Sequence, residues 1–236
     1  MNGFLALAVF VGLIAALQLQ ARWIARGTLP KRASRKLGHV GLGTVLIVSW
    51  PWFGTSPTSR YFAAAPAFGL ALYFLALGLG AIRDDAVIRA AGRDGDRREL
   101  LAGPMLYVIP FGLLVAVFGP SVVAASALAC LVYGDAMAEV AGRGLRTPRL
   151  PWSREKTWGG LAGAWVGGLV GSAAVLLYLG AFGALDAGVA LPSASSTGLR
   201  LAAVAGAGAL VESVSSGDLD NLTIVIGTMV AALLLF

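Results

Sequence analysis

The segment "FLALAVFVGLIAALQL" (residues 4–19) decides the fold class, because it is apolar over nearly its whole length. A helix needs about 20 apolar residues to cross the hydrocarbon core of a bilayer. No Lys or Arg precedes the segment and basic residues follow it. That order is the reverse of the charged start of a secretory signal. The sequence therefore predicts a retained transmembrane helix with its N-terminus outside.

The composition extends this interpretation to the whole chain. Of 236 residues, 58% are hydrophobic and 13% are charged, and the mean hydropathy is +0.80. Soluble domains carry roughly 25% charged residues. The 32 glycines suit close packing of helices through small residues. We therefore expect an all-α, polytopic integral membrane protein whose residues 1–236 form a single transmembrane catalytic domain.

Apolar runs predict about eight transmembrane helices in one bundle. They cover residues 3–19, 38–53, 61–82, 104–118, 121–139, 159–183, 199–214 and 221–236. Glycine-rich segments with polar ends, such as "LRLAAVAGAGALVESV" (199–214), are weak signals in a hydropathy scan and leave seven or nine spans open.

The basic residues then predict the orientation of these helices. All but two of the 18 lie in or beside the first, third and fifth loops. By the positive-inside rule these loops are cytoplasmic. The residues are Arg22, Arg26, Lys31, Arg32, Arg35, Lys36, Arg83, Arg89, Arg93, Arg97, Arg98, Arg143, Arg146, Arg149, Arg154 and Lys156. We expect the inner membrane of a bacterium or archaeon, with the active site at the cytoplasmic face.

The distribution of charge disfavours a nucleic-acid site, and the cysteine count disfavours a disulfide. Membrane-length apolar segments interrupt the basic residues, and no aromatic residues alternate with them, so nucleic acid is not an expected partner. Cys130 is the only cysteine. It therefore has no partner for an intramolecular disulfide and is expected in the core.

A pair of carboxylates marks the first candidate site. In "CLVYGDAMAEVAGRG" (130–144), an apolar run leads into Asp135 and Glu139, which are four residues apart. On a helix they share one face, and acidic residues at membrane depth are functional by default. Mg²⁺ commonly uses one or two carboxylates together with substrate phosphates. The alternative is that the two carboxylates only form salt bridges with Arg143 and Lys156.

The residues that follow this pair have the composition of a phosphate site. Glycines such as Gly134 let backbone approach a ligand closely. Arg143 and Lys156 supply donors for phosphate oxygens. Next, Thr157, Gly159 and Gly160 open a helix whose free N–H groups suit an anion.

Further polar clusters reach the same predicted side of the membrane. In "SRKLGHVGLG" (34–43), Arg35 and Lys36 are candidate phosphate donors, and His39, the only histidine, is a candidate base. In "VESVSSGDLDNLTI" (211–224), Glu212 and Asp220 are candidate metal ligands, and Asn221 is a candidate for binding the base or ribose. The alternatives are a juxtamembrane basic cluster and simple helix capping.

The order of these motifs resembles that of a known family. The elements are "RKLGH" (35–39), "RRELLAGPMLY" (97–107), "GDAMAEVAGRGL" (134–145), "KTWGGLAG" (156–163) and then Glu212, Asp220 and Asn221. They resemble the phytol kinase and dolichol kinase group of CTP-dependent polyprenol kinases, which is similar in turn to membrane phosphatidate cytidylyltransferases. The resemblance implies a membrane enzyme that uses CTP and a divalent cation. It places the family's acidic pair on Asp135 and Glu139.

The leading hypothesis is CTP-dependent phosphorylation of a membrane isoprenoid alcohol, such as phytol, a polyprenol or dolichol. Asp135, Lys156 and His39 are its candidate catalytic residues. The expected partners are CTP, Mg²⁺ or another divalent cation, and the lipid alcohol, and a homo-oligomer is left open. One alternative is cytidylyl transfer from CTP to a lipid phosphate. Another is an ion- or proton-coupled transporter, and a third is a non-catalytic membrane scaffold.

Overall fold

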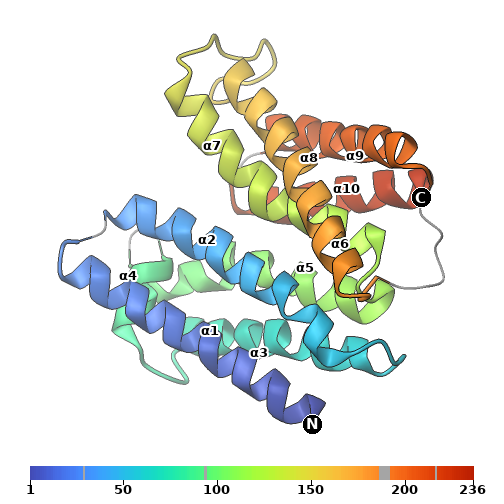
Figure 1. Ribbon diagram of the computed structural model, residues 1–236. Helices are drawn as coiled ribbons and strands as arrows, with labels where there is room; N and C mark the ends of the chain where they lie inside the picture. The colour runs from blue at the N-terminus through green and yellow to red at the C-terminus, as the bar shows by residue number, and fades with distance from the viewer. Residues whose placement is uncertain (29, 93–94, 186–191, 216) are drawn as a thin grey trace. The chain divides into compact units, whose positions relative to one another are not determined.

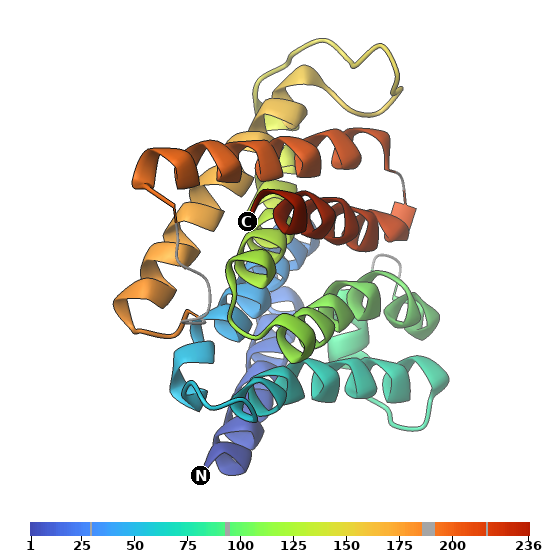
Figure 2. The same cartoon turned by 90° about the vertical axis from the view of Figure 1, so that its right-hand side faces the viewer.

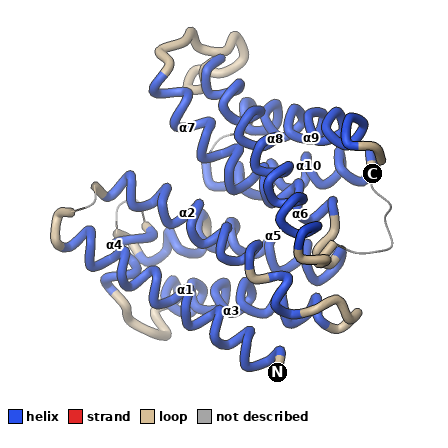
Figure 3. Tube along the Cα trace, viewed as in Figure 1, coloured by secondary structure: helices blue, strands red, loops and turns tan. Residues whose placement is uncertain are grey.

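The computed structural model describes residues 1–28, 30–92, 95–185, 192–215 and 217–236 (Figure 1). Within these ranges the chain is helical and contains no strand (Figure 3). The helices fall into two compact units, Met1–Val117 and Phe118–Phe236, and each is described by itself. The assignment of one catalytic domain to the whole chain stays a prediction.

The first unit is built around α1, which packs against α2, α3 and α4. Its elements are α1 (Asn2–Ala25), α2 (Lys31–Val48), the 3₁₀ helix η1 (Trp50–Phe53), α3 (Ser59–Leu79), α4 (Asp85–Ala91), the 3₁₀ helix η2 (Arg97–Leu101) and α5 (Gly103–Phe118). Asp84 links three of these helices. Its carboxylate accepts hydrogen bonds from the side chains of Gln18 and Tyr73 and from the backbone N–H of Val87 in α4.

The second unit is built around α8, whose main partners are α7 and α9. Its elements are α6 (Val122–Ala129), the π-helical segment η3 (Cys130–Gly134), α7 (Asp135–Gly144), α8 (Trp158–Ala181), α9 (Ala194–Val214), the 3₁₀ helix η4 (Gly217–Leu219) and α10 (Asp220–Leu235). In Figure 2, α9 and α10 lie side by side, and the loop between α7 and α8 forms one end of this unit.

Glycines of α8 allow its close approach to η3 and α7. A Cβ atom at Gly163 would lie 2.5 Å from the carbonyl oxygen of Met137, and one at Gly167 would lie 2.6 Å from that of Tyr133. Gly171 faces the ring of Tyr133 in the same way. The spacing of four residues places these glycines on one face of α8, as in small-residue packing of membrane helices. The high glycine content therefore serves helix packing in this unit.

The helices confirm an all-α polytopic membrane protein. By length and composition, six described helices can cross a membrane: Asn2–Ala25, Ser59–Leu79, Arg97–Phe118, Val122–Gly144, Trp158–Ala181 and Ala194–Val214. The other two predicted spans fall on α2 with η1 and on the shorter helix α10. The basic first turns of α2 lower its hydropathy, and α10 has only 16 residues. The count of eight stays a prediction.

Candidate functional site

The carboxylate pair begins directly after the π-helical segment. Val122–Gly144 is one continuous span in which η3 separates α6 from α7, and Asp135 is the first residue of α7. Single π-helical turns inside α-helices occur frequently at functional sites. Asp135 and Glu139 are both partly buried. They therefore lie one turn apart on α7, as the spacing predicts.

Glu139 also pairs with Arg143 on the same helix. The Arg143 Nε atom lies 3.4 Å from Glu139 Oε1, and the arginine side chain is 56% exposed. A pair of this type, four residues apart on an exposed helix face, contributes only about 0.3–0.5 kcal/mol. The salt-bridge alternative therefore holds for Glu139 and Arg143, but the pair is weak enough for Arg143 to exchange its partner for a phosphate.

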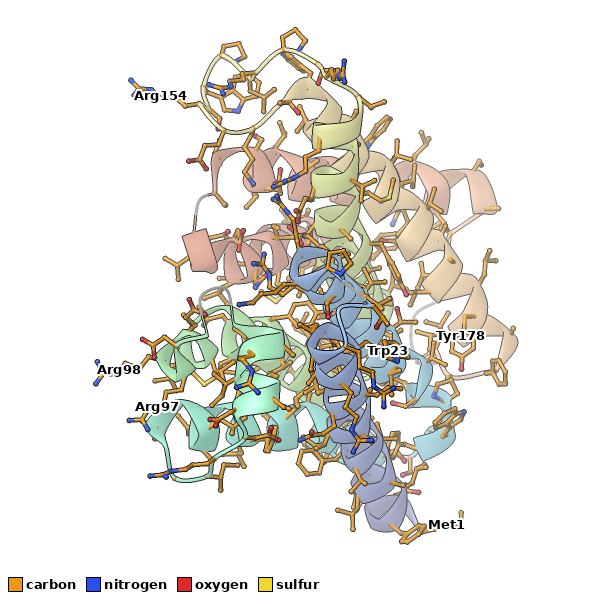
Figure 4. All side chains as sticks on the ribbon, turned by 90° about the vertical axis from the view of Figure 1, so that its left-hand side faces the viewer. Met1, Trp23, Arg97, Arg98, Arg154 and Tyr178 are labelled. Carbon is orange, nitrogen blue, oxygen red and sulfur yellow. The ribbon has the colours of Figure 1, made fainter. Side chains whose placement is uncertain are left out.

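The loop 145–157 between α7 and α8 has a fixed backbone. The N–H of Leu150 donates to the Lys156 carbonyl oxygen at 2.9 Å, and the N–H of Trp158 donates to the Pro148 carbonyl oxygen at 3.1 Å. Figure 4 shows Arg154 extending away from this loop. Because the two halves of the loop are hydrogen-bonded to each other, Lys156 has a defined place just before α8.

Lys156 forms an ion pair with Glu212 of α9. The side chains are 26% and 7% exposed, respectively. A charged group so far from water is costly unless it is paired. Glu212, predicted as a metal ligand, therefore serves in this structure as the counter-ion of Lys156. The salt-bridge alternative predicted a paired lysine, but it gave Asp135 and Glu139 of α7 as the partners.

The first N–H groups of α8 already have acceptors. Gly159 N donates to Thr147 Oγ1 at 2.6 Å, and Gly160 N donates to Thr157 Oγ1 at 3.1 Å, so Thr157 caps the helix. Gly159 and Gly160 are buried. Phosphate binding at this helix end would require these hydrogen bonds to be exchanged, and it stays a prediction.

Gly134 also lies in a helix contact. It is buried in η3, and a Cβ atom there would lie 3.1 Å from the carbonyl oxygen of Ala164 in α8. The absence of a side chain thus lets α8 approach the segment that precedes Asp135. The predicted contact of Gly134 with nucleotide is not tested by this geometry.

At the start of α10, Asp220 and Asn221 make local hydrogen bonds. Asn221 N donates to Asp220 Oδ1 at 2.8 Å, and the hydroxyl of Thr223 donates to the Asp220 carbonyl oxygen at 3.1 Å. The N-cap residue of α10 is Leu219, with no side-chain capping hydrogen bond, so the structure does not bear out the helix-capping alternative. The predicted roles of Asp220 in metal binding and of Asn221 in nucleotide binding remain predictions.

The predicted metal ligands do not form one cluster. Among the residues that the structure describes, no three His, Cys, Asp or Glu side chains are grouped so that they could hold a metal ion. A magnesium site needs fewer protein ligands than that, because Mg²⁺ retains waters and binds substrate phosphates. Asp135 and Glu139 supply carboxylate oxygens, the donor type that Mg²⁺ uses, and their role as its ligands stays a prediction.

In the first unit, the predicted base lies against an aromatic ring. His39 and Tyr107 have ring centroids 4.2 Å apart, and the Tyr107 hydroxyl donates to the His39 carbonyl oxygen at 2.5 Å. Arg35 and Lys36 lie on the same helix, α2, and are partly buried. Tyr107 was not among the predicted site residues, although it ends the motif "RRELLAGPMLY" (97–107). The other candidate residues belong to the second unit.

Comparison with known proteins gives several plant relatives. A probable phytol kinase of Zea mays chloroplasts is 32% identical over 238 residues, covering 100% of this chain and 77% of the relative. A chloroplast farnesol kinase of Arabidopsis thaliana is 35% identical, covering 89% of this chain and 68% of the relative. A probable phytol kinase of Triticum aestivum chloroplasts is 34% identical, covering 89% and 70%.

These relatives are chloroplast proteins, so they do not support the expected bacterial or archaeal membrane. No family model matches the chain, and no solved structure matches it significantly.

Proposed function

Since this chain belongs to the family of phytol and farnesol kinases, we propose that it transfers the γ-phosphoryl group of CTP to the hydroxyl of a membrane isoprenoid alcohol. One observation of the structure carries the assignment of the site. Lys156 is held in a largely buried ion pair on an ordered loop that joins α8 to α7, the helix of the carboxylate pair. The site combines a cation for phosphate with oxygen ligands for a metal ion.

In the proposed reaction, the oxygen of the alcohol forms a bond to the γ-phosphorus of CTP. The bond between that phosphorus and the oxygen bridging to the β-phosphate breaks, and CDP leaves. The proton of the hydroxyl passes to a base. Phosphoryl transfer of this kind depends mainly on positioning and on neutralisation of charge, so the protein needs cations and fixed geometry more than a covalent intermediate.

Asp135 and Glu139 are the proposed ligands of Mg²⁺. When bound, the ion neutralises charge on the phosphate oxygens. Lys156 and Arg143 bind phosphate oxygens from the protein side. Arg143 can leave its exposed pair with Glu139 at little cost. Lys156 would either retain Glu212 as a neighbour or exchange it for phosphate.

The remaining roles fall on residues of α2 and α10. His39 accepts the proton, Arg35 and Lys36 bind phosphate, and Asn221 contacts the base or ribose of CTP. The cytoplasmic face follows from the positive-inside rule. His39, Arg35 and Lys36 lie in the first unit, so their roles are tested separately from those of the second unit.

The test uses CTP labelled at either the α- or the γ-phosphate, with protein in lipid nanodiscs and farnesol, phytol, geranylgeraniol or dolichol as acceptor. We expect γ-label in the lipid product, and none of the α-label. Transfer of α-label to a lipid phosphate would instead establish the cytidylyltransferase alternative. Transfer from ATP in preference to CTP would overturn the choice of nucleotide. No transfer to any of these alcohols would reject the kinase assignment.

A further inference from the structure

We propose that an apolar track along α9, bounded by Trp152 and Trp165, holds the isoprenoid chain of the acceptor alcohol and directs its hydroxyl towards Lys156. The inference rests on the proposed function, because it assigns a binding surface to the lipid substrate of that reaction. All residues of the track belong to the second unit.

One end of the track is a shallow pocket of about 430 Å³. It is lined by Trp152, Leu210, Val211, Ser213 and Val214. The only polar side-chain group contributed by α9 is the Ser213 hydroxyl, which accepts a hydrogen bond from Trp152 Nε1 at 3.1 Å and donates to the Leu210 carbonyl oxygen at 2.7 Å. Because the polar atoms bind one another, the pocket presents apolar surface.

The other end is formed by Trp165 of α8. Its indole Nε1 donates to the carbonyl oxygen of Ala202 at 2.9 Å, and its ring lies beside Gly206. From Ala202 to Ser213 the helix rises by about 16 Å. Both tryptophans thus hydrogen-bond to groups of α9 and leave apolar ring surface beside the helix. Between them, Leu210 is 57% exposed.

Lys156 lies beside the Trp152 end of the track. Trp152 and Lys156 belong to the same loop, and Glu212 stands between Val211 and Ser213 in α9. The two segments that form the pocket are therefore the same two that form the Lys156–Glu212 ion pair. In the proposed reaction the phosphate is transferred to the hydroxyl end of the isoprenoid chain, and the track ends beside Lys156, the proposed ligand of that phosphate. An apolar chain that carries the reacting hydroxyl at one end therefore fits both the track and its position.

The track acts by orientation more than by affinity. Lipid tails are as apolar as leucine side chains, so an isoprenoid chain gains little free energy by moving from the bilayer onto α9. A fixed direction of the chain instead brings the hydroxyl to the reacting phosphate, and alignment of this kind accelerates a reaction strongly. A blocked track should therefore lower kcat/KM for the lipid and leave the binding of CTP unchanged.

The first test fills the track at Gly206. A Cβ atom there would meet only the Trp165 ring, at 3.8 Å, which is ordinary van der Waals contact. Gly206→Leu should therefore fold, and we expect it to lower kcat/KM for farnesol by about tenfold, the scale of a misfit in an apolar pocket. Gly198→Leu makes the same change in α9 at an exposed position with nothing within 4 Å. It should retain the kcat/KM of the unmodified protein.

Thermal stability and the KM for CTP show whether Gly206→Leu loses activity through a general loss of folding or of nucleotide binding. We expect both to match those of Gly198→Leu. Equal kcat/KM values for farnesol in the two variants would overturn the track. The track would also be overturned if a raised KM for CTP or a lowered Tm fully explained the loss of kcat/KM for farnesol in Gly206→Leu.

The second test does not require turnover. A farnesol analogue carrying a diazirine on its chain is photo-crosslinked to the protein in nanodiscs, and the labelled peptide is mapped. We expect labelling within 202–214 that excess farnesol suppresses and excess hexadecane does not. Labelling elsewhere in a protein that phosphorylates farnesol would reject the track alone. Labelling of the track without phosphorylation of any isoprenoid alcohol would reject the proposed function and retain the binding site.

Discussion

The buried carboxylate of Glu212 depends on Lys156 to compensate its charge. The residue is 5% exposed, and Lys156 is its ion-pair partner. Removing one member of a fully buried pair costs about 3–5 kcal/mol, because the other charge is left without compensation. The partial exposure of Lys156 lowers this cost. The pair should therefore matter both for the order of the loop 145–157 and for the position of the lysine.

Glu212→Gln should loosen this loop. We expect a lower Tm in detergent and faster tryptic cleavage after Arg149 and Arg154, which are exposed residues of the loop. Glu155→Gln is the matched control, since it makes the same change at an exposed position of the loop and should leave both properties unchanged. Equal cleavage rates in the two variants would show that the ion pair does not hold the loop.

Asp135→Asn and Lys156→Ala should each lower kcat by at least about 100-fold, which is the usual scale for loss of an electrostatic contact in the transition state. The measurement is transfer of γ-label from CTP. Since Lys156→Ala also leaves Glu212 without its ion-pair partner, the double variant Lys156→Ala/Glu212→Gln separates the two effects. It should recover stability but not activity. Activity near that of the unmodified protein in Asp135→Asn would remove this residue from the site.

At the level of elements, the interface between α7 and α8 depends on missing side chains. Gly163, Gly167 and Gly171 follow one face of α8, and a Cβ atom at any of them would collide with η3 or α7. Such contacts cannot relax by rotation of a side chain where the neighbour is a carbonyl oxygen. The orientation of Asp135 relative to the loop 145–157 therefore depends on glycines that contact no ligand in this proposal.

Gly167→Ala should destabilise the protein by about 1–3 kcal/mol, the usual cost of overpacking. This corresponds to a decrease in Tm of roughly 3–10 °C for a chain of this size. Gly180→Ala is the control in the same helix, where the nearest atom to an added Cβ is a leucine methyl at 3.8 Å. It should leave Tm unchanged or raise it, because alanine favours a helix. Thermal unfolding in detergent measures both.

At the scale of the whole molecule, the charges distinguish between six and eight spans. With only the six long helices in the membrane, the basic start of α2 and the loop 145–157 would lie on opposite sides. If α2 also crosses, both lie on one side. The positive-inside rule favours the second topology, although the hydropathy of α2 alone does not.

Thiol labelling of sealed vesicles tests this topology. Arg32→Cys and Arg154→Cys, each in a Cys130→Ser background, should react with an impermeant maleimide from the same side, and Ser56→Cys should react from the opposite side. All three positions are exposed in the structure. Labelling of Arg32→Cys and Arg154→Cys from different sides would establish that α2 does not span the membrane.

The sequence predicts the helices and the local pairs well, because both depend on neighbours along the chain. Asp135 and Glu139 lie one turn apart as their spacing requires. Long-range pairs are different. Glu212 is 56 residues from Lys156, and the carbonyl of His39 is 68 residues from the Tyr107 hydroxyl that binds it. Hydrophobic periodicity shows which face of a helix is buried but not which helix covers it.

Glycine roles were ambiguous for a related reason. A missing Cβ lets either a ligand or another helix approach, and the sequence around Gly159 and Gly160 does not distinguish the two. The structure places both glycines against α7, where added Cβ atoms would meet the carbonyl oxygens of Ala141 and Ala138.

The π-helical segment Cys130–Gly134 lets this span absorb a change of length. Its wider turn takes up one residue more than an α-helical turn. Deletion of one residue there, for example Leu131, therefore gives an unbroken α-helix and leaves the carboxylates of Asp135 and Glu139 close to their present direction relative to α6. A deletion within α6 itself would instead turn them by about 100°. The span should therefore tolerate the loss of one residue in this segment better than the loss of one in α6.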